Sequence, residues 1–108
     1  MNLANAEVLV IGMKRSGQAA ADLLQKRGAR VRMVDENEPG EEEQLFLNTH
    51  NLTVEKQLVE NLGAPELIVV SPGLPVDIPL LVEARVRSIP VIGEVELAGF
   101  YLKGPVIG

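Results

Sequence analysis

Three short segments combine residue types that bind phosphates and sugars. In the first, residues 12–17 (GMKRSG), two glycines, two cations and a hydroxyl follow an apolar run and open a helical pattern. Unpaired N–H groups at a helix N-terminus, at the positive end of the helix dipole, form a natural phosphate site. The dinucleotide fingerprint has glycine at its third position, where this chain has Lys14. The segment predicts an anion site, with a purely structural glycine turn as the alternative.

Two side chains of this segment are cations, although the chain as a whole is acidic. The formal net charge is -5, yet Lys14 and Arg15 adjoin the predicted helix start, where an anion would be drawn. Solvated surface cations are the alternative interpretation. Ser16 is predicted to be the N-cap of the helix, and its hydroxyl is also suited to donate to a phosphate oxygen.

The other two segments follow further apolar runs. Asp35 lies 23 positions after Gly12, near the ~20-residue offset at which an acidic residue meets a ribose hydroxyl in dinucleotide binders. Residues 71–73 (SPG) form a rigid turn that would present N–H groups and a hydroxyl to a sugar or phosphate. The alternatives are a turn-capping aspartate and a structural turn.

Several other polar or aromatic residues are interpreted as structural. His50, amid Asn and Thr with no partner for a triad or a metal site, is predicted to lie in a surface loop. Glu94 and Glu96 open a helical pattern, where carboxylates favour the dipole, so they are predicted to cap it rather than catalyse. Phe100 and Tyr101 are interpreted as docking residues.

The elements that must position these segments alternate between strand and helix. Short apolar runs predict strands, and spacing of apolar residues at three and four predicts helices, with Gly28 ending the first. The predicted strands are residues 7–11, 30–34, 52–54, 66–71 and 89–92; the predicted helices are 16–27, 41–48, 56–62, 79–87 and 95–102.

This alternation predicts a single α/β domain. Strand–helix–strand units form right-handed crossovers, so we expect a Rossmann-like, about five-stranded, mostly parallel sheet with helices on both faces. The aliphatic composition, 46% hydrophobic but 3% aromatic, suits buried parallel strands. Residues 12, 35 and 71 would all lie at strand carboxyl ends and converge on one crevice.

Composition excludes several classes of function. The chain has no cysteine and one histidine, which leaves no thiolate site and little to build a metal site from. The acidic charge argues against a nucleic-acid partner. The absence of a long apolar run and of a signal-peptide pattern predicts a cytoplasmic protein without membrane association.

The motifs together resemble the N-terminal domains of the Mur ligase family, in particular of its D-glutamate-adding branch. The resemblance covers nearly the whole chain and is carried by the turn at 12–17, by Asp35, and above all by residues 67–75 (LIVVSPGLP), 79–81 (PLL) and 89–97 (IPVIGEVEL). A serine-proline-glycine turn and a Gly-Glu-x-Glu-Leu segment at this separation are not general Rossmann features.

The resemblance implies a UDP-sugar-binding domain at residues 1–103, with residues 104–108 beginning the linker or first strand of a central ATPase domain. It implies an ATP- and Mg²⁺-dependent ligase that joins D-glutamate to UDP-N-acetylmuramoyl-L-alanine in peptidoglycan synthesis, with central and C-terminal domains as further partners. This fragment would hold no catalytic residue, metal or cofactor. The substrate-binding residues implied are Lys14, Arg15, Ser16, Gly17, Asp35, Glu36, Ser71, Pro72 and Gly73.

Two departures from the family pattern are visible. Family members commonly have glycine where Lys14 stands, and a small hydroxyl residue and arginine where Glu36 and Asn37 stand. Two other hypotheses remain: an NAD-binding dehydrogenase or regulatory module, which would use Gly12 and Asp35 but leaves residues 71–75 unexplained, and an interaction domain with structural glycines.

Overall fold

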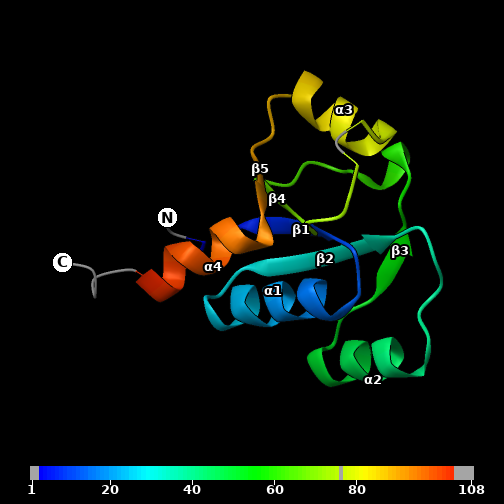
Figure 1. Cartoon of the computed structure of the whole chain (residues 1–108), viewed down its shortest axis with the longest axis vertical. Coiled ribbons are helices and arrows are strands. Elements are labelled where there is room, and N and C mark those ends of the chain that lie inside the picture. Colours follow the sequence, from blue (N-terminus) through cyan, green and yellow to red (C-terminus); the bar gives the residue numbers. More distant parts are fainter. Residues whose placement is uncertain (1–2, 76, 104–108) are drawn as a thin grey trace.

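The computed structural model describes residues 3–75 and 77–103, with only the backbone for residues 98 and 100–103. Strands and helices alternate throughout this part of the chain (Figure 1). Their bounds are β1 Glu7–Ile11, α1 Arg15–Lys26, β2 Arg30–Asp35, α2 Glu41–His50, β3 Val54–Lys56, the 3-10 turn η1 Val59–Asn61, β4 Leu67–Val70, α3 Pro79–Val86, β5 Val91–Gly93 and α4 Glu94–Lys103.

The strands form one parallel sheet in the order β3-β2-β1-β4-β5. The strand order reverses at β1, which pairs with β2 on one side and β4 on the other; Val10 lies opposite Met33 and Val69. A parallel sheet binds ligands at such a switch point, at the strand carboxyl ends. The predicted α/β, Rossmann-like class is confirmed, and every pairing is parallel.

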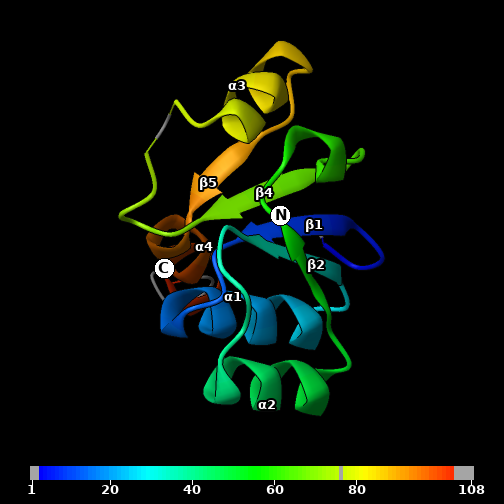
Figure 2. The ribbon, with the colours of Figure 1, turned by 90° about the vertical axis from the view of Figure 1, so that its right-hand side faces the viewer.

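Alternate residues of the central strands supply two separate cores. Val8 and Val10 face one core with α1, α2 and α4, while Leu9 and Ile11 face the other with α3 and η1. Figures 1 and 2 show α1 and α2 beneath the sheet and α3 above it. Burial on both faces explains why β1 reads as a continuous apolar run rather than an alternating pattern.

The boundaries differ from prediction in the β3 region. The helix predicted at 56–62 is wrong: Lys56 is the last residue of β3, and only Val59–Asn61 form a 3-10 turn. The strand predicted at 52–54 lies two residues later. Gly28 follows the C-cap of α1 with φ +86°, as a C-terminal stop requires. The predicted linker at 104–108 and the side chains of Phe100 and Tyr101 lie outside what the structure describes.

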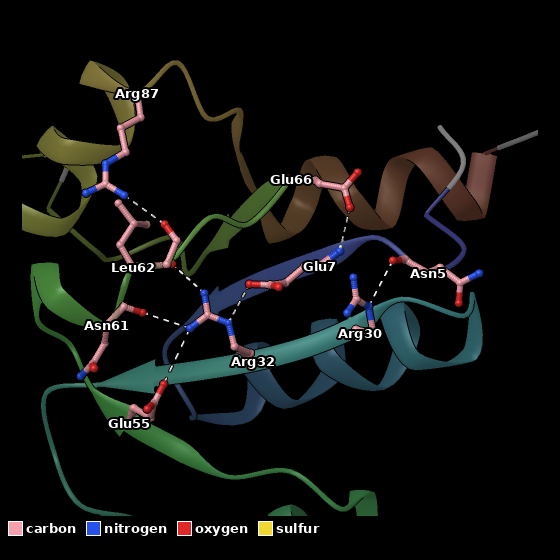
Figure 3. Close-up of polar contacts among 10 residues, drawn as sticks. Asn5, Glu7, Arg30, Arg32, Glu55, Asn61, Leu62, Glu66 and Arg87 are labelled. Atoms are coloured by element: carbon pink, nitrogen blue, oxygen red, sulfur yellow. Dashed lines mark hydrogen bonds and ion pairs between the residues drawn. The ribbon is translucent and has the colours of Figure 1, made fainter.

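Arg32 of β2 joins three elements on the α3 side of the sheet (Figure 3). Its guanidinium donates to Glu7 Oε2 at 3.0 Å and to the carbonyls of Asn61 and Leu62 at 3.0 and 2.6 Å. Glu55 Oε1 lies 3.7 Å away. The half-buried cation thus replaces regular structure in holding the loop between β3 and β4 against β1 and β2.

Candidate functional site

The segments that follow β1, β2 and β4 converge as the sequence predicts. They line an open cavity of about 270 Å³ at the carboxyl ends of the strands. Its lining residues are Ile11, Gly12, Lys14, Asp35, Glu36, Asn37, Gln57, Ser71, Gly73, Leu74 and Pro75. The structure thus brings together Lys14, Asp35, Glu36, Ser71 and Gly73 among the predicted site residues, while Arg15, Ser16, Gly17 and Pro72 lie outside the cavity wall.

The turn after β1 depends on its two glycines. Gly12 has φ +109°, a conformation that side chains disfavour, and its N–H donates to Val34 O at 2.8 Å. A Cβ on Gly17 would lie 2.0 Å from the carbonyl oxygen of Gly12. The absence of side chains therefore lets the first turn of α1 pack directly on the end of β1.

The N-terminus of α1 has unpaired amides. The first helical bond runs from the Gln18 N–H to Lys14 O at 2.9 Å. The N–H groups of Arg15, Ser16 and Gly17 precede it, as the orphan donors of a helix start do, and have no acceptor among the residues described. Such amides are suited to an anion.

The predicted cap of this helix is wrong. Lys14, not Ser16, is the N-cap, and no side chain caps the helix. Ser16 lies inside the first turn, exposed, because the tight Gly12 turn starts the helix at Arg15. Lys14 and Arg15 are also exposed, and neither has an ion-pair partner within residues 3–75 and 77–103. Both cations are thus available to an anion from solvent.

Asp35 ties the first two loops together. Its carboxylate is 7% exposed and accepts the Met13 N–H on Oδ2 at 2.9 Å and the Asn37 N–H on Oδ1 at 2.8 Å. The predicted turn-capping role is therefore present, and each oxygen retains a lone pair. Glu36 and Asn37, next to it, are exposed.

Ser71 makes a connection that the sequence did not predict. Its hydroxyl donates within the chain, with Glu94 Oε2 at 3.1 Å and Ile11 O at 3.3 Å as acceptors. Glu96, as predicted, caps α4 by accepting the Gly93 N–H at 3.0 Å. Glu94 instead turns toward β4, and its other oxygen, Oε1, is buried without a hydrogen-bond partner among the residues that the structure describes. The sequence places Glu94 directly after a strand, but only the structure shows that this strand pairs with β4.

His50 is not in a loop and is not without a partner. It ends α2, half-buried, with Nε2 3.1 Å from Asp22 Oδ1 of α1, and it stacks on Phe46 at 4.0 Å between ring centroids. Hydrogen bonds to the Asp22 carboxylate, mainly from Lys26 and then from His50, hold the pKa of Asp22 below its ordinary value of 3.8. The prediction failed because α2 continues two residues beyond the predicted helix and meets α1. His50 therefore belongs to a helix–helix contact.

Two further hollows flank the site. One, of about 440 Å³, lies between the end of β2, α2 and β3, and shares Asp35 and Asn37 with the candidate site. The other, about 250 Å³ and almost wholly apolar, lies between α1 and α4 beside the exposed Val95. The walls of the first hollow come from consecutive elements, residues 35–56, whereas those of the second come from helices far apart in the chain.

The part of the chain that the structure describes has neither a metal-binding cluster nor a membrane-spanning helix. Within it, no cluster of three His, Cys, Asp or Glu side chains could hold a metal ion. None of the helices described there is long and apolar enough to cross a bilayer.

The fold and the turn define a doubly wound α/β domain with a glycine turn at its switch point. Residues 6–93 match the family described as Mur ligase MurD-like, N-terminal domain. The chain belongs to this family, so the resemblance inferred from its motifs is confirmed.

Curated relatives agree with this assignment. A UDP-N-acetylmuramoylalanine–D-glutamate ligase of Acidobacterium capsulatum is 41% identical over 99% of this chain and 24% of its own length, and one of Crocosphaera subtropica is 45% identical over 95% and 24%. The chain spans about a quarter of these relatives. The structure of the UDP-N-acetylmuramate-alanine ligase MurC of Thermotoga maritima has a similar fold, with TM-score 0.75 and 21% identity over 91% of this chain and 23% of its own.

Proposed function

We propose that this chain is the substrate-binding N-terminal domain of an ATP-dependent ligase that adds D-glutamate to UDP-N-acetylmuramoyl-L-alanine in peptidoglycan synthesis. Residues 1–103 would form the domain, and residues 104–108 would lead into a central ATPase domain. The observation that carries the proposal is the cavity at the switch point, with the unpaired amides of α1 beside it, in a chain of this family.

The arrangement of charges suits an anionic handle. Lys14 lines the cavity next to the amides of Arg15, Ser16 and Gly17, in a chain whose formal net charge is -5. A diphosphate held there would gain charge-assisted hydrogen bonds from Lys14 and from the amides at the positive end of the helix dipole. We assign the diphosphate to Lys14 and the start of α1.

The two flanks of the cavity would take the rest of the ligand. Asp35 and Glu36 lie on the β2 side, where we place the uridine, while Ser71 and Gly73, joined by Pro72 outside the wall, lie on the β4 side, where we place the sugar. The chain would contribute binding and orientation only. ATP and Mg²⁺ would bind the other domains, where the phosphoryl transfer takes place.

The alternative of NAD binding is disfavoured by the opening turn. Lys14 occupies the position where the dinucleotide turn needs glycine. The NAD hypothesis also leaves the Ser71 turn unused.

Calorimetric titration of the chain with UDP, UDP-N-acetylmuramoyl-L-alanine and NAD tests the proposal. We expect both uridine ligands, but not NAD, to bind. Lys14→Glu should weaken their binding by about 1–2 kcal/mol, the scale of a lost charge-assisted contact. Lys26→Glu makes the same charge change at the far end of α1 and should have little effect.

The results would separate the hypotheses. NAD binding without UDP binding would support a dehydrogenase-like module, and binding of none of the three would support an interaction domain. An affinity unaltered by Lys14→Glu would refute the assignment of Lys14 while leaving the family intact.

A further inference from the structure

The Ser71 hydroxyl can donate only one hydrogen bond, and that bond is made within the chain. A serine hydroxyl donates once and accepts twice. Both acceptors within reach, Glu94 Oε2 at 3.1 Å and Ile11 O at 3.3 Å, belong to the protein. The Glu94 carboxylate is the closer acceptor and the charged one, so it receives the hydrogen bond, and Ser71 offers the cavity a lone pair and not a donor.

Glu94 is placed to enforce this polarity. It is the first residue of α4 and comes directly after β5, which pairs with β4, so the sheet itself brings it beside Ser71. It is not needed to cap the helix, since Glu96 does so. Its Oε1 atom is buried without a partner within the described chain, which costs stability.

The position of Ser71 decides which part of the ligand it meets. Gly12 and Lys14 stand between the β2 flank at Asp35 and the β4 flank at Ser71. This step rests on the proposed function: with the diphosphate in the middle and the uridine at Asp35, the group at Ser71 belongs to the sugar.

We propose that Glu94 is a positioning residue that holds the Ser71 hydroxyl as a hydrogen-bond acceptor toward the cavity. The site then selects a donor on the sugar portion, a hydroxyl or an amide N–H. A phosphoryl oxygen, which can only accept a hydrogen bond, is disfavoured at Ser71. The hydroxyl already donates its hydrogen bond to the neighbouring Glu94 carboxylate.

A double-mutant cycle tests the coupling. The wild type, Ser71→Ala, Glu94→Ala and the double variant are titrated with UDP-N-acetylmuramoyl-L-alanine and with UDP. Each single change should weaken binding of the sugar ligand about five- to ten-fold, the effect of one neutral hydrogen bond. The double variant should bind no more weakly than either single one. UDP, which lacks the sugar, should change less than about two-fold.

The conservative variant separates positioning from structure. Glu94→Gln keeps a carbonyl oxygen as acceptor and should recover most of the lost affinity, whereas Glu96→Gln, two residues along the same helix, should leave affinity unaltered. In the ligand-free chain, Glu94→Ala should shift the NMR amide resonances of Ser71 and Gly12, which is packed against Ser71, and Glu96→Gln should not.

Contrary results are distinct. Equal losses of affinity for UDP and for the sugar ligand would mean that Ser71 serves the diphosphate. Additive losses in the cycle would mean that Glu94 acts elsewhere. Either result overturns the inference about Glu94 but leaves the proposed function standing. A wild-type chain that binds neither ligand overturns the proposed function and the inference with it.

Discussion

At the scale of single residues, the opening turn tolerates no side chain at Gly17. A Cβ there would meet the Gly12 carbonyl oxygen at 2.0 Å, so backbone has to move. We expect Gly17→Ala to lower the free energy of unfolding by about 1–3 kcal/mol, as overpacking does. Urea denaturation measures this.

Gly73→Ala is the matched control. It lies on the other side of the site, where a Cβ would meet nothing within 4 Å, and should change stability by less than about 0.5 kcal/mol. Equal losses for the two variants would mean that the close approach of α1 to β1 is relaxed in solution.

The sequence located the loops of the site but not their side-chain bonds. Gly12, Asp35 and Ser71 were found because each follows a strand, and a parallel sheet brings strand ends together. The bond from Ser71 to Glu94 joins residues 23 positions apart and depends on β5 lying beside β4, which strand alternation alone does not specify. Ser16 was misassigned because capping rules ignore how tightly Gly12 turns.

At the scale of elements, the Arg32 side chain holds the loop between β3 and β4 against β1 and β2. Arg32→Met would leave the carbonyls of Asn61 and Leu62 and the Glu7 carboxylate without their donor. We expect a loss of about 2–3 kcal/mol in unfolding free energy, since these bonds are charge-assisted and half-buried. Thermal or urea denaturation gives the value.

Arg30→Met, on the same strand, controls for the lost charge. Arg30 is exposed and donates from Nε to Asn5 O only at 3.2 Å, so its removal should cost less than about 1 kcal/mol. UDP affinity should be unaltered in both variants, because neither residue lines the cavity. Equal costs would show that the loop carbonyls bond equally well to water.

The contact between α1 and α2 should respond to acid. Hydrogen bonds from Lys26 and His50 hold the pKa of Asp22 below 3.8 in the folded chain, so the carboxylate stabilises the fold above its unfolded pKa. That contribution disappears as pH falls through the lower folded pKa. The stability difference between wild type and Asp22→Asn should therefore shrink below about pH 4. Urea denaturation from about pH 7 to about pH 2.5 follows it, with exposed Asp77→Asn as the control.

The helices and strands were predicted correctly where the apolar pattern and the length of a segment indicated the same type of element. The runs around β1 and β4 are buried on both faces, and α1 has a clear apolar stripe. Around β3, two polar residues, Glu55 and Lys56, stand in a three-residue edge strand paired on one side only. Pairing with β2, which no local sequence pattern encodes, decides that this segment forms a strand.

At the scale of the whole molecule, the chain should bind without catalysing. Residues 12–17 have the spacing of the ATP-binding loop Gly-x4-Gly, but Gln18-Ala19 follow where that loop requires lysine and a hydroxyl residue. We expect no release of phosphate from MgATP by a preparation that still binds UDP. Turnover above that of a buffer blank would contradict the proposed division of labour between domains.

The crevice is assembled from three connections that are each anchored separately to a parallel sheet. For protein engineering, this means that the two ends of the pocket that we propose for the sugar and the base can be diversified in independent libraries, at residues 73–75 and 36–37. The glycine turn would be kept constant as the shared handle, and a designer could combine the best variants from each library afterwards.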